Sequence, residues 1–557
     1  MFDNVIELYQ KSWRENFELP ALTNYGDSRG ALTYGDMAAR IARIHLLMKR
    51  IGIRRGDKIA LVGRNSAAWV VAFMATVTYG GTIVPILHDF SHNDVQHIVR
   101  HSESRILFVA ESIYRHLDFE AMPGLLGVIS LESGKVLAHR HIDGLKDLAE
   151  VEASVDAAFA EKYPDGFKPE NIDYDLTIPA SHTAIINYTS GTTGFSKGVM
   201  LSLDNLAGNL AYGVCSKLHY RNSRALSFLP LAHAYGCAFD MIVPLAVGTH
   251  ITLVGKTPSP KILLQAFEEV RPSLILCVPL ILEKIYKRMI VPVLKKSHIR
   301  TALAVPGLRR IVYGLIRKRL VKAFGGEFEE VIVGGAPISR EVEAFLHKIR
   351  FPFTVGYGMT ECAPLISHTP WRHFSPASSG HVLDGIMEVA ISSDDPENIP
   401  GEILVRGRNV MQGYYKEPGL TSDAIEDGWL HTGDMGTVDH DGGTIRICGR
   451  YKTMILGPSG QNIYPEAIED RVNALPYVLE SLVIEREGHL QVLIVPDVDA
   501  LERDGIEEDS RFKLFDEARV KLNGTLAPFE RIDSVMIMPE EFEKTPKRSI
   551  KRFLYTA

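Results

Sequence analysis

The sequence is poor in cysteine and has no excess of positive charge. Its 557 residues include five cysteines, which sit far apart and form no CxxC pair, so a disulfide scaffold or a zinc ribbon is excluded. With 61 lysines and arginines against 68 acids, the net charge of −7 argues against a dedicated nucleic-acid-binding protein, which usually has a basic domain.

Long apolar runs are also missing. No stretch of about 18 uncharged apolar residues occurs, so the sequence predicts no membrane span. Residues 1–13 carry acids where a signal peptide needs bases. These absences favour a cytoplasmic enzyme, and a hydrophobic content of 46% is ordinary for a globular protein.

Short apolar runs alternate with helical patterns through most of the chain. Residues 57–62 and 81–87 are predicted to be buried strands, with a helix at 67–79 between them and another at 37–48, capped by Thr33. This alternation indicates an α/β fold with mostly parallel sheets. The pattern changes to short β-runs from about Gly380, and the residues after Arg450 form a compact unit with strands and helices of their own.

Residues 283–322 depart from the acidic total, because they carry twelve lysines and arginines and a single acid, Glu283. Leucines, isoleucines and valines are interleaved with these charges, which indicates one or two basic amphipathic helices. Three interpretations stay open: a solvated helical face, a patch that binds the membrane surface, or, least favoured, a nucleic-acid contact.

Residues 185–202 (IINYTSGTTGFSKGVMLS) carry the strongest chemical signal. A predicted strand enters a loop whose glycines let backbone N–H groups close around a phosphate, while hydroxyls add donors and Lys197 adds charge. The loop is not a Walker A motif, because Lys197 is followed by Gly198 and not by serine or threonine. The other candidate residues are Thr189, Ser190, Gly191, Thr192, Thr193 and Gly194.

This loop resembles the SGTTGxPKG signature of the adenylate-forming superfamily, which includes acyl-CoA synthetases, peptide-synthetase adenylation domains and luciferases. Ser196 stands where the proline is usual. Further motifs follow in the family's order. Residues 229–236 (LPLAHAYG) resemble the segment whose histidine lines the acyl site, which indicates His233. Residues 333–337 (VGGAP) resemble the loop that packs on adenine, and the residues implied are Gly335, Ala336 and Pro337.

Residues 355–364 (VGYGMTECAP) resemble the segment with an adenine-stacking aromatic, a phosphate-binding threonine and a magnesium-binding glutamate. A glutamate also suits Mg²⁺ on chemical grounds, since this hard cation takes oxygen ligands. The residues that the resemblance assigns to the nucleotide and the metal are Tyr357, Gly358, Met359, Thr360 and Glu361.

Two motifs near the end of the predicted large domain complete the set. Residues 429–436 (WLHTGDMG) resemble the ribose-binding motif and indicate Asp434, whose two oxygens can accept hydrogen bonds from neighbouring hydroxyls. Residues 449–452 (GRYK) resemble the hinge, with Arg450 near the ribose and Lys452 at the hinge itself.

The resemblance implies a large domain at residues 1–450, made of two α/β subdomains and a β-rich one, and a mobile α+β lid at 451–557. It implies an acyl-CoA synthetase that uses ATP, Mg²⁺ and coenzyme A. Medium- or long-chain fatty acids are favoured, because residues 283–322 resemble an insertion of long-chain synthetases and small apolar residues follow His233.

One position contradicts the family pattern. The family's C-terminal lysine reaches the substrate carboxylate and the α-phosphate, but here Ser549 occupies that place in residues 544–552 (KTPKRSIKR). Losing one such donor costs on the order of 10²–10³ in rate. Lys547 or Lys551 could substitute for it, since both project to the same side of an extended segment. Impaired adenylation and a misaligned segment are the other interpretations.

Two alternatives to a fatty acyl-CoA synthetase remain. One is a ligase for an aryl acid, an amino acid or an acyl carrier protein; an amino-acid ligase would need an acid for the substrate ammonium, and Asp240 is the single acid between His233 and Lys256. The other is a relative that binds nucleotide or acyl groups without adenylating them. The location expected is the cytoplasm, with peripheral contact at the inner face of the membrane as a further prediction.

Overall fold

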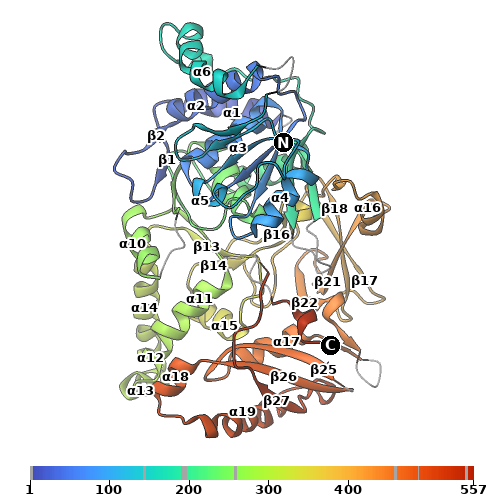
Figure 1. The fold of residues 1–557 in the computed structure, drawn as a ribbon. Helices are drawn as coiled ribbons and strands as arrows, with labels where there is room; N and C mark the ends of the chain where they lie inside the picture. The colour runs from blue at the N-terminus through green and yellow to red at the C-terminus, as the bar shows by residue number, and fades with distance from the viewer. Residues whose placement is uncertain are drawn as a thin grey trace.

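The structure is a computed structural model that describes residues 4–141, 146–189, 197–255, 260–456, 461–486, 488–545 and 550–556. It has the predicted α/β architecture. A large N-terminal part holds two mixed sheets and a β-rich region, and a smaller C-terminal part lies at the bottom of Figure 1. Within the described ranges, every helix falls short of the length or the apolar character that a bilayer span requires.

The first sheet comes mainly from the N-terminal stretch of the chain that ends at Ser202. Its central strands β4, β3 and β5 are parallel, as the strand–helix alternation predicts, whereas β8 and β9 form an antiparallel hairpin. Strand β19, from much later in the chain, pairs with β9. Across the sheet the strands are β19 (Gly413–Tyr414), β9 (Lys197–Ser202), β8 (Thr183–Thr189), β4 (Thr82–Ile86), β3 (Lys58–Val62), β5 (Ser104–Val109), β6 (Gly127–Ser130) and β7 (Val136–His139).

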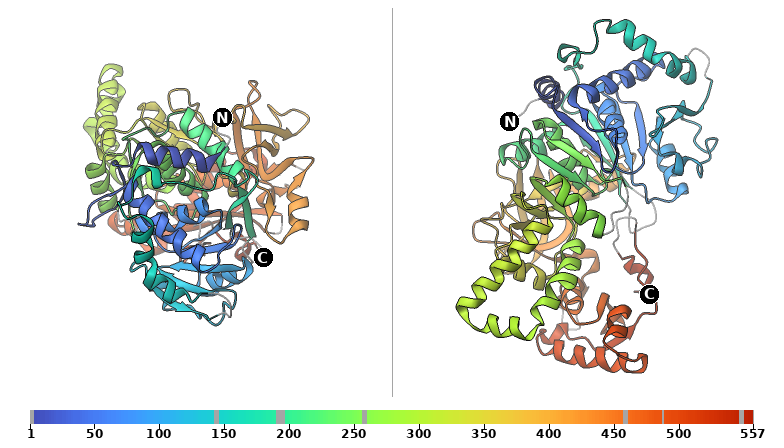
Figure 2. Two further views of the ribbon diagram at one scale, coloured as in Figure 1. Left: turned by 90° about the horizontal axis from the view of Figure 1, so that it is seen from above. Right: turned by 90° about the vertical axis from the view of Figure 1, so that its left-hand side faces the viewer.

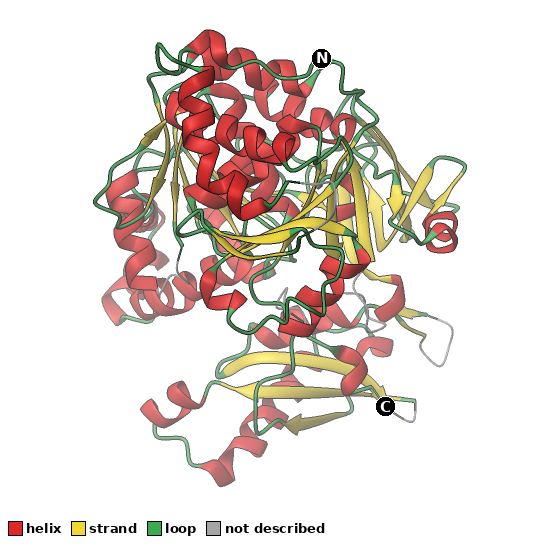
Figure 3. Cartoon of the chain, turned by 45° about the horizontal axis from the view of Figure 1, so that its top comes forward, coloured by secondary structure: helices red, strands yellow, loops and turns green. Residues whose placement is uncertain are grey.

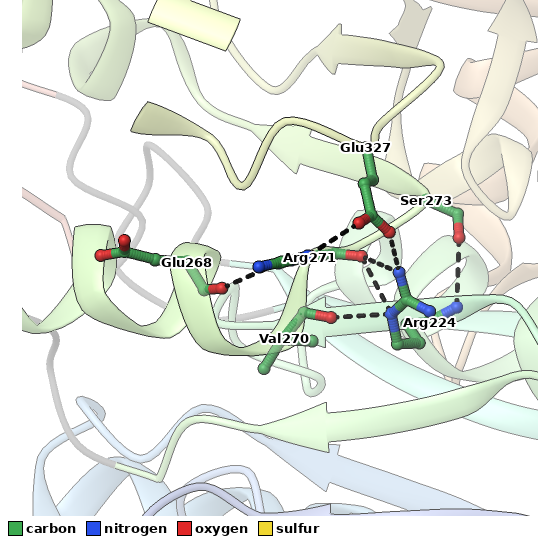
Figure 4. Close-up of polar contacts among 6 residues, drawn as sticks. All are labelled: Arg224, Glu268, Val270, Arg271, Ser273 and Glu327. Carbon is green, nitrogen blue, oxygen red and sulfur yellow. Dashed lines mark hydrogen bonds and ion pairs between the residues drawn. The ribbon is translucent and has the colours of Figure 1, made fainter. Parts of the chain in front are cut away.

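The second sheet is parallel apart from its last strand, so the carboxyl ends of its strands lie together at one edge and their amino ends at the other. At the amino edge, Arg224, Ser273 and Glu327 join the starts of neighbouring strands through side-chain hydrogen bonds (Figure 4). Across the sheet the strands are β14 (Phe353–Val355), β13 (Glu330–Val333), β12 (Leu274–Cys277), β10 (Arg224–Ser227), β11 (His250–Leu253), β1 (Pro20–Asn24) and β2 (Leu32–Thr33).

Helices α2 (Tyr34–Arg50) and α3 (Ala67–Tyr79) illustrate why the local sequence predicts the elements well. Thr33 caps α2 in a capping box with Asp36, as the sequence indicated. Helix α3 begins after the cap Ser66 and ends at Gly80, whose φ of +84° suits glycine. Because α3 is apolar on nearly every face, it is buried almost throughout.

Many of the remaining helices cover the sheets of the large part or belong to the C-terminal part (Figure 3), whereas others, at the margin, pack on neighbouring helices. They are α1 (Val5–Glu15), α4 (His92–His101), α5 (Glu111–Tyr114), α6 (Leu148–Lys162), α7 (Leu203–Cys215), α8 (Ala234–Cys237), α9 (Val243–Val247), α10 (Pro260–Val270), α11 (Pro279–Ile285), α12 (Val291–Leu294), α13 (Ser297–Ala304), α14 (Pro306–Ala323), α15 (Arg340–Lys348), α16 (Pro418–Ala424), α17 (Pro465–Asn473), α18 (Val498–Arg503) and α19 (Glu508–Asn523).

The β-rich region predicted from Gly380 is an antiparallel sheet, and the C-terminal part has a small sheet of its own. The C-terminal part also has separate hydrophobic clusters, around Ile468 and Phe515 and around Leu482 and Phe542. The boundary between residues 450 and 451 stays a prediction. The strands are β17 (Met387–Ser392), β18 (Gly401–Gly407), β21 (Trp429–Val438), β20 (Ile425–Glu426) and β22 (Ile445–Arg450), then β25 (Val478–Arg486), β26 (His489–Pro496) and β27 (Ser534–Ile537).

The basic stretch is more broken than one or two helices. It runs from the end of α11 through a π-helical turn at Tyr286–Ile290 into α12, α13 and α14. Pro306 lies at the first turn of α14, after the extended Val305, where proline is tolerated because the first helical N–H groups have no partner within the helix. Pro292 lies inside the continuous helical run of α11, the π-turn and α12, directly after that turn. These yellow-green helices lie at the margin of the molecule (Figure 2, right).

Candidate active site

The candidate site lies at the carboxyl edge of the second sheet. Strand β13 ends at Val333 and leads into the predicted adenine loop, in which Gly335, Ala336 and Pro337 are exposed. Tyr235 lies beneath this loop, because its hydroxyl donates to the carbonyl of Ile332 at 3.0 Å. A Cβ at Gly334 would lie 3.2 Å from the Tyr235 ring, a tight contact that glycine avoids.

A pocket opens at this edge, with about 550 Å³ of space between atoms, counting the solvent at its mouth. Its lining combines residues that the sequence assigned separately to the acyl group and to the nucleotide. The predicted residues that it brings together are His233, Gly335, Tyr357, Gly358, Met359 and Thr360.

The rest of the lining is mainly apolar, and includes Leu218, Phe239 and Leu365. His368, which the sequence interpretation missed, adds a polar ring whose Nδ1 lies 2.6 Å from the hydroxyl of Tyr212. Burial lowers the pKa of His368 to about 4, so the ring is neutral near pH 7. The pocket therefore gains no positive charge from this histidine.

Asp434 is buried in β21, where it pairs with Arg450 at the end of β22 and faces the Tyr357 segment. The hydroxyl of Tyr357 donates to Oδ2 at 2.7 Å, and Nε of Arg450 lies 3.0 Å from Oδ1. Burial raises the pKa of the Asp434 carboxyl, while Arg450 and the Tyr357 hydroxyl oppose that rise. A carboxylate has about four acceptor positions, so Asp434 can still accept hydrogen bonds from a ligand with two neighbouring hydroxyls.

The predicted phosphate loop connects the two strands of the β8–β9 hairpin. Thr189 and Lys197 face each other as the last pair of this hairpin, so the sheet fixes both ends of the loop. Ser190, Gly191, Thr192, Thr193 and Gly194 lie outside the described residues, and their roles stay predictions.

Tyr414 connects the hairpin to the predicted metal ligand, and the sequence interpretation did not include it. Its hydroxyl donates to Oε1 of Glu361 at 3.0 Å, and Nζ of Lys197 lies 5.0 Å from the centre of its ring. The pairing of β19 with β9 creates this contact between segments that are remote from each other in sequence.

The residues present suit Mg²⁺ bound together with a nucleotide. Mg²⁺ is usually held by one or two carboxylates and by substrate phosphates. Within the described part of the chain, only Tyr414 bonds the Glu361 carboxylate, at Oε1, so Oε2 can serve as an oxygen ligand. No three His, Cys, Asp or Glu side chains of the described residues form a metal cluster, so phosphate oxygens would have to supply most of the remaining ligands.

The predicted C-terminal residues lie in the smaller C-terminal part, which the sequence predicts to be a lid, or outside the described residues. Lys452 is exposed in the turn that follows β22. Nζ of Lys551 donates to Glu543 at 3.1 Å, and no hydrogen bond among the described residues joins Lys551 to the pocket. Lys547 and Ser549 lie outside the described residues, so their part in catalysis stays a prediction.

Contacts between the lid and the large part were also missed by the sequence interpretation. Nζ of Lys287 donates to the carbonyl of Asn473, at the end of α17, at 3.1 Å. The backbone N–H of Arg340 donates to Asp470 of the same helix at 3.1 Å. At least one lysine of the basic stretch therefore docks the lid and does not belong to a freely solvated face.

Comparison with known proteins identifies the family. The sequence profile described as "AMP-binding enzyme" matches residues 9–415. The long-chain-fatty-acid–CoA ligase FadD15 of Mycobacterium bovis is 27% identical over 566 residues, covering 94% of this chain and 90% of that protein. The feruloyl-CoA synthase of an Amycolatopsis species is 28% identical over 487 residues and covers 86% of each chain.

The fold match extends past the profile to nearly the whole chain. The anthranilate CoA ligase AuaEII, solved with anthranoyl-AMP, superposes with a TM-score of 0.76 over 99% of this chain and 96% of its own, at 18% identity. This chain belongs to the AMP-binding enzymes, which confirms the resemblance seen in its motifs. It is an adenylate-forming ligase, of a class that works with ATP, Mg²⁺ and a thiol acceptor such as coenzyme A.

Proposed function

We propose that the protein joins a medium- or long-chain fatty acid to coenzyme A through an acyl-adenylate. The observation that carries this proposal is the pocket, in which His233 and the nucleotide-side residues Tyr357 and Thr360 share one cavity with an apolar interior. Phe239 and Leu365 offer hydrocarbon surface to an alkyl chain, and the neutral ring of His368 imposes no charge on it. The relative FadD15 is named for the same substrate class.

In the first half-reaction, a carboxylate oxygen of the fatty acid attacks the α-phosphorus of ATP, and the bond to the bridging oxygen breaks to release pyrophosphate. Positioning and charge neutralisation suffice for such a step, with no covalent enzyme intermediate. Asp434 holds the ribose hydroxyls, and Lys197 with the phosphate loop neutralises the phosphates. Glu361 would hold Mg²⁺, which supplies further charge neutralisation when bound.

In the second half-reaction, the deprotonated thiol of coenzyme A attacks the acyl carbon, and the bond to the phosphate oxygen breaks to release AMP. The exposed position of Lys452 between the large part and the lid suits a hinge, which would let one site perform both steps. The contacts of Lys287 and Arg340 with α17 would then have to open when the lid turns.

A panel of acids tests the proposal and its alternatives. Pyrophosphate release and thioester formation are measured with saturated fatty acids of increasing length, with ferulate and with amino acids. Medium or long fatty acids are expected to give the highest kcat/KM. A preference for ferulate would favour the aryl-acid alternative, in keeping with the feruloyl-CoA synthase relative.

Amino acids are expected to be inactive. Asp240, the acid that could meet a substrate ammonium, is 3% exposed, and burial raises the pKa of its carboxyl. It is also absent from the residues that line the pocket. Release of pyrophosphate with no acid in the panel would favour a relative that binds nucleotide without adenylating an acid.

Ser549 gives a second test within the same assay. If a neutral side chain limits adenylation, Ser549→Lys should raise pyrophosphate release by roughly 10–10³-fold, while thioester formation from supplied acyl-adenylate should change little. If Lys547 or Lys551 compensates, the wild type is already fast and replacing that lysine with alanine removes the activity.

The same enzyme is proposed to bind an anionic membrane surface through α14. Leu308, Ile311 and Leu315 recur at spacings of three and four, so they share one face, and they are 48%, 59% and 60% exposed. Lys318 and Lys322 continue the same spacing and are exposed. An apolar stripe that runs into lysines suits lipid headgroups with acyl chains beneath them.

Sedimentation with vesicles tests the membrane contact. The protein should sediment with vesicles that contain phosphatidylglycerol and be released by high salt, because salt screens the attraction. Replacing Leu308, Ile311 and Leu315 with serine should weaken sedimentation without changing adenylation. Equal behaviour with neutral and anionic vesicles would return α14 to an ordinary solvated surface.

A further inference from the structure

Tyr414 reaches the site through strand pairing and not through proximity in sequence. It lies opposite Val199 in the β19–β9 pair, two residues from Lys197 along β9. Its backbone is fixed from the other side as well, because its N–H donates to Thr421 of α16 at 2.9 Å. The Tyr414 side chain is therefore presented beside Lys197 by a backbone anchored on two sides.

The hydroxyl of Tyr414 holds the carboxylate that the metal would need. It donates to Oε1 of Glu361 at 3.0 Å, and the carbonyl of Glu361 accepts the N–H of Met411 at 2.8 Å. The segment from Met411 to Tyr414 thus holds Glu361 at both its backbone and its side chain.

The ring of the same tyrosine holds the lysine. Nζ of Lys197 lies 5.0 Å from the ring centre, within the range of a cation–π contact. One side chain therefore touches a group proposed to hold the metal and a group proposed to neutralise the phosphates. These two groups come from separate motifs that lie far apart in the sequence.

We propose that Tyr414 is a positioning residue for adenylation, whose hydroxyl orients the Glu361 carboxylate toward Mg²⁺ and whose ring places the Lys197 ammonium at the phosphates. This inference rests on the proposed adenylation function. A metal ligand held by a hydrogen bond from a neighbouring residue keeps its orientation, and removing such a partner typically costs about 10–100-fold in metal affinity or activity.

The adjacent tyrosine provides a matched control. The hydroxyl of Tyr415 donates to Glu103 at 3.0 Å, in a network with Lys416. Tyr415→Phe therefore removes one hydroxyl from the next residue of the same segment without touching Glu361 or Lys197. Tyr414→Phe removes the hydroxyl and keeps the ring, and Tyr414→Leu removes both.

The test measures metal binding directly. Free Mn²⁺ is followed by electron paramagnetic resonance in the presence of enzyme and an ATP analogue with a methylene group between the α- and β-phosphorus. Tyr414→Phe should weaken Mn²⁺ binding by about 10–100-fold, and Tyr415→Phe should match the wild type. AMP binding without metal should be the same in all three. Tyr414→Leu should in addition weaken binding of the analogue, because Lys197 loses its ring.

A double-mutant cycle separates positioning from a loss of folding. In a Glu361→Gln background, Tyr414→Phe should cost little further Mn²⁺ affinity, whereas a general structural defect would lower the affinity again. Equal Mn²⁺ affinity in wild type and Tyr414→Phe would overturn the inference whatever the activity. If wild type binds Mn²⁺ with the analogue and Tyr414→Phe weakens that binding, Tyr414 positions the metal ligand even where no acid is adenylated, so the two proposals fail separately.

Discussion

Carboxylates at the two edges of the parallel sheet that contains β10, β12 and β13 lie in different surroundings. At the amino edge, Glu327 lies between Arg271, at 3.1 Å, and Arg224, at 2.5 Å (Figure 4). The hydrogen bond from Arg271 contributes most, and together with that from Arg224 it holds the pKa of Glu327 below its usual value. Beside the carboxyl edge, Asp434 of β21, in the neighbouring β-rich sheet, accepts a hydrogen bond from Tyr357, and burial raises the pKa of its carboxyl.

The difference separates a carboxylate whose contacts are made within the protein from one that keeps acceptor positions for the proposed ligand. Arg224 also donates to the carbonyls of Val270 and Arg271, so the amino edge is joined by contacts within the protein. Asp434 instead is buried with two donors and spare acceptor positions beside an open pocket. Nucleotide binding should therefore depend on the carboxyl edge and be indifferent to the amino edge.

The largest expected effect comes from Lys197, which begins β9 opposite the last residue of β8, at the carboxyl edge of the first sheet. Lys197→Ala should lower acid-dependent pyrophosphate release by about 10²–10³-fold, because it removes one charged donor from the transferring phosphate. Lys58→Ala is the control. Lys58 begins β3 at the amino edge of the same first sheet, and its Nζ lies 3.9 Å from a carboxylate oxygen of Glu103. Equal losses in the two variants would show that the comparison between edges has no functional meaning.

The next effect concerns nucleotide affinity. Hydrogen bonds to a charged group contribute about 1.5–3 kcal/mol, so Asp434→Ala should weaken AMP binding by roughly 10–150-fold. Calorimetry with AMP measures this directly. Glu327→Ala should leave the affinity unchanged, and a similar loss in that variant would contradict the assignment of the two edges.

A raised carboxylate pKa does not by itself indicate a ligand site, because Glu469 has one and does not line the pocket. Burial raises the pKa of Glu469 in the lid to about 7, against opposing contacts with Arg552 and the N–H of Val483. Between about pH 4.5 and pH 7, Glu469 keeps its proton in the folded protein but has released it in the unfolded chain. The free energy of unfolding of the C-terminal part should therefore fall as the pH rises through this window and level off above it.

Glu469→Gln should flatten this dependence while leaving AMP affinity unchanged. Thermal unfolding of both proteins from pH 5 to pH 8 measures the slope. A variant whose Tm falls with pH as steeply as that of the wild type would show that another group titrates here.

Much of the fold was predictable because its elements are locally determined. The Thr33 cap, the apolar helix α3 and the strands at 57–62 and 81–87 each follow from a few neighbouring residues. The basic stretch was less predictable, because breaks at Lys296 and Val305 divide it and Lys287 has a partner in the C-terminal part that no local pattern reveals.

The residues of the candidate site could be predicted where they belong to sequence motifs. Residues that reach the site only through the pairing of distant strands could not. His233, Tyr357 and Thr360 meet in the pocket as their motifs indicated. Tyr414 was missed because its contacts with Glu361 and Lys197, and so its proposed role, depend on β19 lying beside β9, a pairing between two strands that are distant in sequence. His368 was missed because a single histidine in a strand-rich region gives no sign of lining a pocket.

Detection of the acyl-adenylate tests the central claim most directly. Wild type and Ser549→Lys are incubated with Mg²⁺, a long-chain saturated fatty acid and ATP labelled at the α-phosphate, without coenzyme A, at enzyme excess, and the products are separated after acid quenching. Labelled acyl-AMP should form in amounts equal to the pyrophosphate released, and should disappear when coenzyme A is added. Labelled ADP as the product, or no acid-dependent product in either protein, would contradict the account.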